Sequence, residues 1–252
     1  MALVELQHRL GAEVQVILAS DPWLLPARPL VAGCFVAFAT GAAGPGQPGD
    51  RAWAAAVVWE ASPSSEAMPR SVDDHLRGRS RQWPRRADDI VAQSVVSARV
   101  PAAYRPGLLA LREGTILADA IEALDVRPDV VLVDASGVDH PRRAGLAVQL
   151  GAFTRLPTVG VTQRSLLATG TWPDLRRGAS SPVAVEGRPV GYWVCTRTGA
   201  RPVLAHAAWR TSAETASATV LAASTEAART PVPLQDARRV AREARTRAEA
   251  AG

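Results

Sequence analysis

Lysine is absent from this sequence, and all 29 basic residues are arginine. Cysteine is scarce as well: Cys34 and Cys195 stand alone, which excludes a disulfide framework and a cysteine-based zinc site. Both lie in apolar runs, so we expect buried thiols. No apolar run reaches the roughly 18 residues of a membrane span, and the first residues lack the basic-then-apolar layout of a signal peptide. We therefore expect a cytoplasmic protein without a membrane segment.

The charge balance is basic but modest. The 252 residues carry a formal net charge of +5, and the pI is about 10.4. Because arginine titrates at a higher pH than lysine, its exclusive use inflates the pI. This charge permits a polyanionic partner such as nucleic acid without requiring one.

The apolar periodicity predicts one α/β domain. Three strands that pair antiparallel come first, and strands that alternate with helices follow, which predicts a mixed sheet, antiparallel and then parallel, flanked by helices. The expected helices are 3–18, 108–124, 144–153, 212–228 and 234–252, and the expected strands are 30–40, 53–60, 90–100, 129–136, 157–162, 188–198 and 201–209.

The domain is expected to cover residues 1–230, with a basic insertion at 61–89 and a charged helix in 231–252. The insertion is rich in arginine and contains Trp83, so it could contact a phosphate backbone. A solvated linker is the simpler interpretation.

The passage VLVDASGVDHPRRAG (131–145) contains the clearest candidate site. A buried strand delivers Asp134 at its end, where ligands of such sheets bind. A carboxylate there could hold a divalent metal, and the turn and arginines that follow could hold phosphates. The residues after Asp134 that share this position are Gly137, His140, Arg142 and Arg143. A helix cap beside a surface basic pair explains them equally well.

Glu113 could supply a second carboxylate. It lies in the first turn of the helix that follows YRPG (104–107) and could stack over the strand that ends at Asp134. Paired acids of this kind support metal-assisted phosphodiester cleavage. The alternative is a first-turn glutamate favoured by the helix dipole.

Five segments, in this order and spacing, resemble the endonuclease V family over roughly residues 5–228. They are VAGCFVAF, AYRPGLLALREG, VLVDASGVDHPRRAG, LPTVGVTQRSL and PVLAHAAWRTS. The resemblance implies a ribonuclease-H-like fold and magnesium-dependent cleavage of DNA or RNA 3′ of an inosine, as in DNA repair. It also implies a tyrosine-containing wedge that separates strands and a pocket for the deaminated base.

The resemblance assigns roles residue by residue. Glu113 and Asp134 match metal-binding acids, and with His140 they are the candidate catalytic groups. Tyr104, Pro106 and Gly107 match the wedge, where an aromatic ring can stack on a base. Gly137 and His140 match the turn that lines the base pocket, and Arg142, with Arg143 beside it, matches a backbone contact.

The sequence departs from the family at three positions. Phe35 stands where an AGADVGF-like run has aspartate, and Trp209 stands where a GHR-like run has a metal-site histidine. Gln163, with Arg164 alongside, replaces a lysine. Glu214, five residues after Trp209, is a candidate compensating metal ligand.

These departures leave three functions open. The first is recognition of nucleic acid, or of a nucleobase-like ligand, with cleavage lost or strongly weakened. The second is an active magnesium-dependent, inosine-directed endonuclease that uses Glu113, Asp134 and Glu214. The third is an enzyme redirected to a small nucleoside-like or amino-bearing metabolite, with Phe35 and Trp209 lining an apolar pocket and Glu113, Asp134 or His140 as general acid or base.

Overall fold

A computed structural model of the protein describes residues 3–41, 44–61 and 90–251. One eight-stranded sheet runs through the described chain in the order β3-β2-β1-β4-β5-β8-β7-β6. The strands are β1 (Leu30–Phe38), β2 (Arg51–Glu60), β3 (Ile90–Arg99), β4 (Val130–Val133), β5 (Thr158–Thr162), β6 (Ser180–Val185), β7 (Arg188–Val194) and β8 (Val203–His206). The helices are α1 (Leu3–Ser20), α2 (Ala110–Glu122), α3 (Leu146–Thr154), α4 (Ala213–Ala222) and α5 (Val232–Ala250).

The sheet is mixed, as the sequence predicts. β1 pairs antiparallel with β2, and β2 with β3, whereas β1, β4 and β5 are parallel. Beyond β5 the pairing returns to antiparallel through β8, β7 and β6. The run VVLV of β4 is buried at all four positions, as expected of a central parallel strand.

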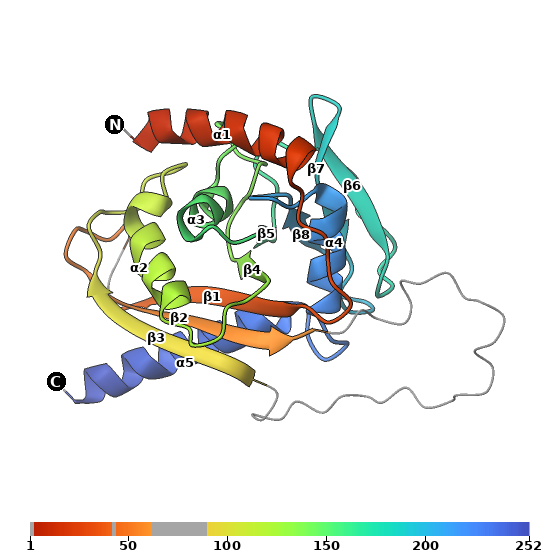
Figure 1. Ribbon diagram of the computed structural model, residues 1–252. Coiled ribbons are helices and arrows are strands. Elements are labelled where there is room, and N and C mark those ends of the chain that lie inside the picture. Colours follow the sequence, from red (N-terminus) through yellow and green to blue (C-terminus); the bar gives the residue numbers. More distant parts are fainter. Residues whose placement is uncertain (1–2, 42–43, 62–89, 252) are drawn as a thin grey trace.

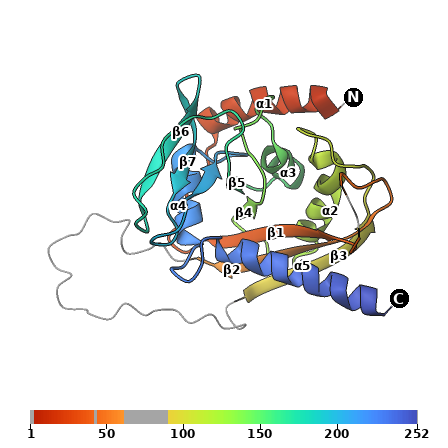
Figure 2. The same cartoon turned by 180° about the vertical axis from the view of Figure 1, so that it is seen from behind.

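Helices cover both faces of the sheet (Figures 1 and 2). α2 and α3 pack on one face, with α1 outside α3, and α4 and α5 pack on the other. Side chains alternate between these faces along β1: Cys34 belongs to the core under α2 and α3, while Phe35 packs against the core under α5. The sheet therefore separates two cores, and each residue of β1 contacts only one of them.

The charged terminal helix α5 is an integral layer of the fold. Its alanine and valine face packs on β1 and β2, with Ala237 and Ala241 fully buried. Gly33 of β1 makes this approach possible, because a Cβ atom there would overlap the backbone of Pro233 and Leu234 at the start of α5.

The expected elements are all present, and their ends differ by a few residues. The largest differences are a shorter α4, which ends at Ala222, and a shorter β7, which ends at Val194. The sequence pattern missed β6, an edge strand that contains Pro182. The insertion at 61–89, except for its first residue, lies outside the described residues, and no helix in the described ranges is long and apolar enough to cross a membrane.

Gly33→Ala should destabilise the protein, because the added methyl group forces α5 away from β1. We expect the free energy of unfolding to fall by about 2–4 kcal/mol in urea titrations. The matched control is Gly114→Ala in α2, where a Cβ atom meets only ordinary contacts. That change should be neutral or stabilising by up to about 1 kcal/mol, and equal losses in both variants would contradict the close packing of α5.

Candidate functional site

The parallel pairing of β1 and β4 brings the first two candidate positions together. Cys34 pairs with Val133 in register, so Phe35 of β1 and Asp134, the residue directly after β4, follow side by side. Alternation places both side chains on the α5 face. Phe35 is therefore adjacent to Asp134, at the position where the resemblance places a second acid.

An arginine of α5 contacts both of these residues. Arg238 Nη2 lies 2.8 Å from Asp134 Oδ2, and the Arg238 guanidinium carbon lies 5.1 Å from the centre of the Phe35 ring. Arg242, one turn further along α5, lies 5.8 Å from the same ring. The carboxylate of Asp134 is thus paired with a guanidinium, and the two arginines stack over an aromatic face.

Glu113 approaches the same strands from α2, on the opposite face. Its charge and that of Asp134 both raise the pKa of the Cys34 thiol, after the larger effect of burial, so the two acids flank this residue of β1. Burial raises the pKa of the Glu113 carboxyl to about 7, Arg112 opposes this shift, and the charge of Asp134 adds to it. Around neutral pH, Glu113 is therefore partly protonated.

These residues do not fit the magnesium ion that the resemblance implies. Among the described residues, no three His, Cys, Asp or Glu side chains gather closely enough to hold a metal. Asp134 is paired with Arg238, and Phe35 offers no oxygen. Magnesium requires several oxygen ligands in a nearly octahedral arrangement.

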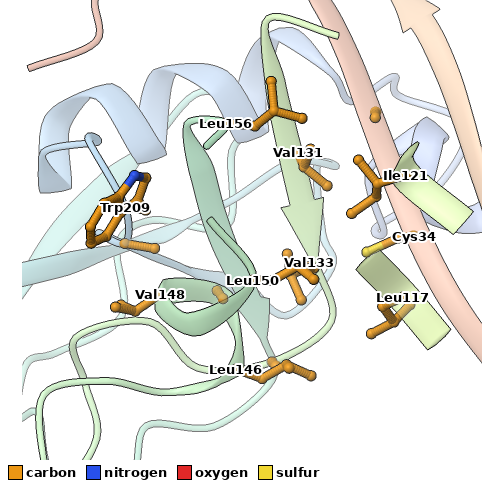
Figure 3. Packing of buried hydrophobic residues seen from close by; sticks show 14 of the residues in the cluster. Cys34, Leu117, Ile121, Val131, Val133, Leu146, Val148, Leu150, Leu156 and Trp209 are labelled. Carbon is orange, nitrogen blue, oxygen red and sulfur yellow. The ribbon is translucent and has the colours of Figure 1, made fainter. Parts of the chain in front are cut away.

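The other candidate metal-site residues lie elsewhere. Glu214, at the start of α4, is exposed and accepts a hydrogen bond of 3.4 Å from the Tyr192 hydroxyl. Trp209 packs on α3, where its Cβ atom prevents any side chain at Gly151. Figure 3 shows Trp209 beside Val148, across α3 from Cys34. The structure thus brings together Phe35 and Asp134, with Glu113 nearby, but neither Glu214 nor Trp209.

The Tyr104–Gly107 loop is exposed at its tip and fastened at its base. Tyr104 is 45% exposed. Gly107 has a φ of 73°, and its carbonyl oxygen accepts hydrogen bonds from Gln7 Nε2 (2.9 Å) and Arg142 Nη2 (2.8 Å). Arg142 Nε also donates to Gln7 Oε1. Arg142 therefore anchors the loop, and the exposed Tyr104 ring is left available for stacking.

His140 lies beneath the same loop. It is buried, and its Nδ1 accepts a hydrogen bond from the backbone N–H of Arg142 (3.2 Å). Burial and the charge of Arg142 lower the pKa of His140, so its neutral form is favoured.

The remaining candidate binding residues lie at the surface or in the turn. Gly137 is buried against Ala207, where a Cβ atom would overlap the Ala207 carbonyl. Gln163 and Arg164 are exposed after β5. Arg143 is partly exposed and lies 3.3 Å from Glu186. Three of these four positions therefore present a polar or basic side chain that is at least partly exposed.

The sequence interpretation missed two polar clusters that position this region. Arg112 is buried, forms an ion pair with Asp50 (2.7 Å) and donates to the Ala102 carbonyl (2.9 Å). That contact lowers the pKa of the Asp50 carboxyl. The pair ties residues 47–50 to the segment before Tyr104. Arg112 directly precedes Glu113 in the motif, but the spacing of apolar residues in the sequence does not predict that its side chain is buried.

The second cluster lies behind His140. Asp139 is fully buried, and its two oxygens accept the backbone N–H groups of Leu166, Leu167 and Ala168 at 2.8–2.9 Å. His206 lies 3.8 Å from it, and its Nε2 is 2.7 Å from the Thr162 hydroxyl. Burial lowers the pKa of His206 to about 4, against the opposing charge of Asp139. A neutral histidine and a hydrogen-bonded carboxylate thus hold the loop after β5.

The endonuclease V family model matches residues 82–239, more than half of the chain. This chain belongs to the endonuclease V family. An endonuclease V from Streptomyces coelicolor is 41% identical over 133 residues, which are 53% of this chain and 57% of that relative. The matched stretch thus spans less than two thirds of the relative's length, and the family model begins at residue 82, after Phe35.

Solved structures of this family extend the likeness to nearly the whole fold. The endonuclease V of Streptomyces avermitilis is 28% identical, with 97% of this chain and 94% of that chain covered and a TM-score of 0.75. The endonuclease V of Ciona intestinalis, crystallised with a 24mer DNA containing an inosine followed by a ribo-adenosine, is 17% identical; 96% and 95% of the chains are covered, with a TM-score of 0.71. The second likeness shows the fold alone. The family confirms the ribonuclease-H-like architecture predicted from the sequence.

Glu113→Gln should change how stability depends on pH. The folded carboxyl has a pKa of about 7 against an ordinary value of 4.5, so the folded wild type retains a proton that the unfolded chain has lost between these values. Wild-type stability therefore falls as the pH rises through this window, whereas the glutamine has no proton to lose. Relative to wild type, the variant should gain on the order of 2 kcal/mol between pH 5 and pH 8 in urea unfolding.

The control for this experiment is Glu122→Gln, an exposed position on the same helix. If the Glu113 and Glu122 variants show the same pH dependence, Glu113 does not have a raised pKa.

Asp139→Asn should loosen the loop at 166–168, because the amide offers one acceptor oxygen in place of two. We expect a loss of about 1–3 kcal/mol in the free energy of unfolding and faster hydrogen exchange at the Leu166, Leu167 and Ala168 amides. Asp119→Asn, at an exposed position of α2, is the matched control and should stay within about 0.5 kcal/mol of wild type. Unchanged exchange at all three amides would contradict the role of Asp139.

Proposed function

We propose that this member of the endonuclease V family recognises nucleic acid and has lost, or strongly weakened, metal-dependent phosphodiester cleavage. The proposal rests on one observation: the exposed Tyr104 is carried on a fastened loop, while the Asp134 carboxylate is paired with the Arg238 guanidinium. Recognition and cleavage would thus have separated in this chain.

The binding half of the proposal is supported by the anchoring of the loop. A side chain that separates or stacks bases must keep its position while the nucleic acid moves, and here Gln7 and Arg142 both hold the Gly107 carbonyl. Aromatic stacking on a base is tolerant of sequence and favourable by about 1–3 kcal/mol per base. The Ciona intestinalis relative crystallised with inosine-containing DNA supports DNA as the first ligand to test.

Exposed arginines among the candidate residues and beside Tyr104 suit a phosphate backbone. Arg105, within the loop, and Arg164 are exposed, and Arg143 is partly exposed. Arginine binds phosphate through paired N–H donors, and contacts of this kind give affinity without sequence preference. Inosine preference would then have to come from the turn at Gly137 and from the buried His140.

The weakening of cleavage is supported by the state of the acids. Glu113 is partly protonated near neutral pH, and Asp134 is paired with Arg238. The Arg238 guanidinium offsets the charge of the Asp134 carboxylate, and Phe35 supplies no oxygen. The redirected-enzyme hypothesis has less support, because Phe35 packs against the core under α5 and Trp209 belongs to the core on the other face of the sheet.

The experiment that tests this function measures binding and cleavage on the same duplex. A fluorescently labelled duplex containing one inosine is titrated with protein in magnesium buffer, and anisotropy and strand scission are recorded together. We expect binding without scission. Tyr104→Ala should weaken binding by about tenfold, because one stacking contact is lost, whereas Tyr104→Phe should retain most of the affinity.

The control is Trp172→Ala. Trp172 is comparably exposed, at 50%, but stacks edge-on against Trp193 of β7, near the other end of the sheet. It should leave binding unchanged. Magnesium-dependent nicking would establish the active endonuclease in place of this proposal, and absence of binding would favour a small-molecule ligand.

A further inference from the structure

The geometry points to Arg238 as a built-in cation at Asp134: its guanidinium occupies the position beside this carboxylate that a divalent metal would otherwise take. We therefore expect Asp134 not to bind a metal ion. This inference deepens the proposed function and rests on it for its biological meaning. It concerns an ion pair within the protein, however, and can be tested without nucleic acid.

Shared use of one oxygen is the first argument. Arg238 Nη2 lies 2.8 Å from Asp134 Oδ2. Magnesium binds carboxylate oxygens at about 2.1 Å and holds its ligands strictly. Two cations cannot approach the same oxygen this closely without strong repulsion. The guanidinium therefore competes with a metal for this carboxylate by charge, because it already lies at one of the two oxygens.

The fixed position of Arg238 is the second argument. It follows Ala237, which is fully buried against the sheet, and α5 begins in direct contact with Gly33 of β1. The packing of α5 on the sheet therefore fixes the position of Arg238 beside the end of β4. Arg238 Nε is itself buried and has no acceptor among the described residues, and within these residues Asp134 is the carboxylate that pairs with the guanidinium.

The ring of Phe35 is the third argument. The Arg238 guanidinium lies over it at 5.1 Å and that of Arg242 at 5.8 Å. A guanidinium stacks favourably on an aromatic face and is weakly hydrated, whereas magnesium retains water and finds no ligand there. Phe35 thus makes the site suited to an organic cation and unsuited to a metal. The two residues act as a pair, although they are far apart in the sequence.

The test measures Mn²⁺ binding to the whole protein by electron paramagnetic resonance of the free ion, with no nucleic acid present. Wild type should not bind Mn²⁺ at Asp134. The double variant Phe35→Asp/Arg238→Ala restores an acid and removes the guanidinium, so it should bind Mn²⁺ at least about tenfold more tightly than wild type. Adding Asp134→Asn should abolish the gained site.

The matched control is Arg239→Ala in the Phe35→Asp background. Arg239 is the next residue of α5 and pairs with Asp236 and Glu243, not with Asp134. The Arg239→Ala substitution removes the same charge from the same helix. It should increase the Mn²⁺ affinity less than Arg238→Ala does. Thermal melting of each variant confirms that it folds, and Arg238→Gln serves as the second variant if the alanine does not.

Two results would overturn the inference. One is Mn²⁺ binding to wild type that Asp134→Asn removes, since the guanidinium then does not hold the position. The other is a folded Phe35→Asp/Arg238→Ala or Phe35→Asp/Arg238→Gln protein that still binds no more Mn²⁺ than the Arg239 control. Because no nucleic acid is present, either result leaves the binding half of the proposed function untouched.

Discussion

The parallel pairing of β1 with β4 is the constraint on which the site depends. It sets residue 35 beside residue 134 and turns both toward α5. Once this register is set, the charge and polarity of the site depend on three side chains. They come from β1 (Phe35), from the end of β4 (Asp134) and from α5 (Arg238). A change at any one of them alters the environment of the other two.

The two faces of the sheet therefore divide the site. Glu113 lies on the α2 side, where its charge raises the pKa of the Cys34 thiol. Arg238 lies on the α5 side, where it pairs with Asp134. Burial thus acts on the carboxyl group that approaches from one face, and a guanidinium acts on the carboxylate at the other. The chain shares the fold of its family, and its own residues set the charge at the ends of these two strands.

Much of the fold could be predicted from local patterns. The buried run of β4 and the helical spacing of α1 are visible in the sequence because burial on one or both faces dictates residue type. β6 was missed because an edge strand has little burial to reveal it, and Pro182 argues against a strand. The family motifs also placed Phe35 and Asp134 in one region, and the structure makes them neighbours.

The residues that complete the site could not be predicted in this way. Arg238 lies 104 residues from Asp134 and belongs to a helix whose many arginines look alike in sequence. Arg112 and Asp139 adjoin candidate residues, yet their inward direction depends on the exact turn of the backbone. The contacts of such polar residues are set by tertiary packing, and local spacing does not report it.

The Tyr104 loop is held in part by a residue outside the stretch that the family model matches. Gln7 belongs to α1, a hundred residues before Gly107, and the family model begins only at residue 82. The stretch that most resembles the family is thus braced by a helix outside it. A chimera that carried residues 82–239 onto a different amino-terminal half would inherit the aromatic tip but lose one of the two side chains that steady it.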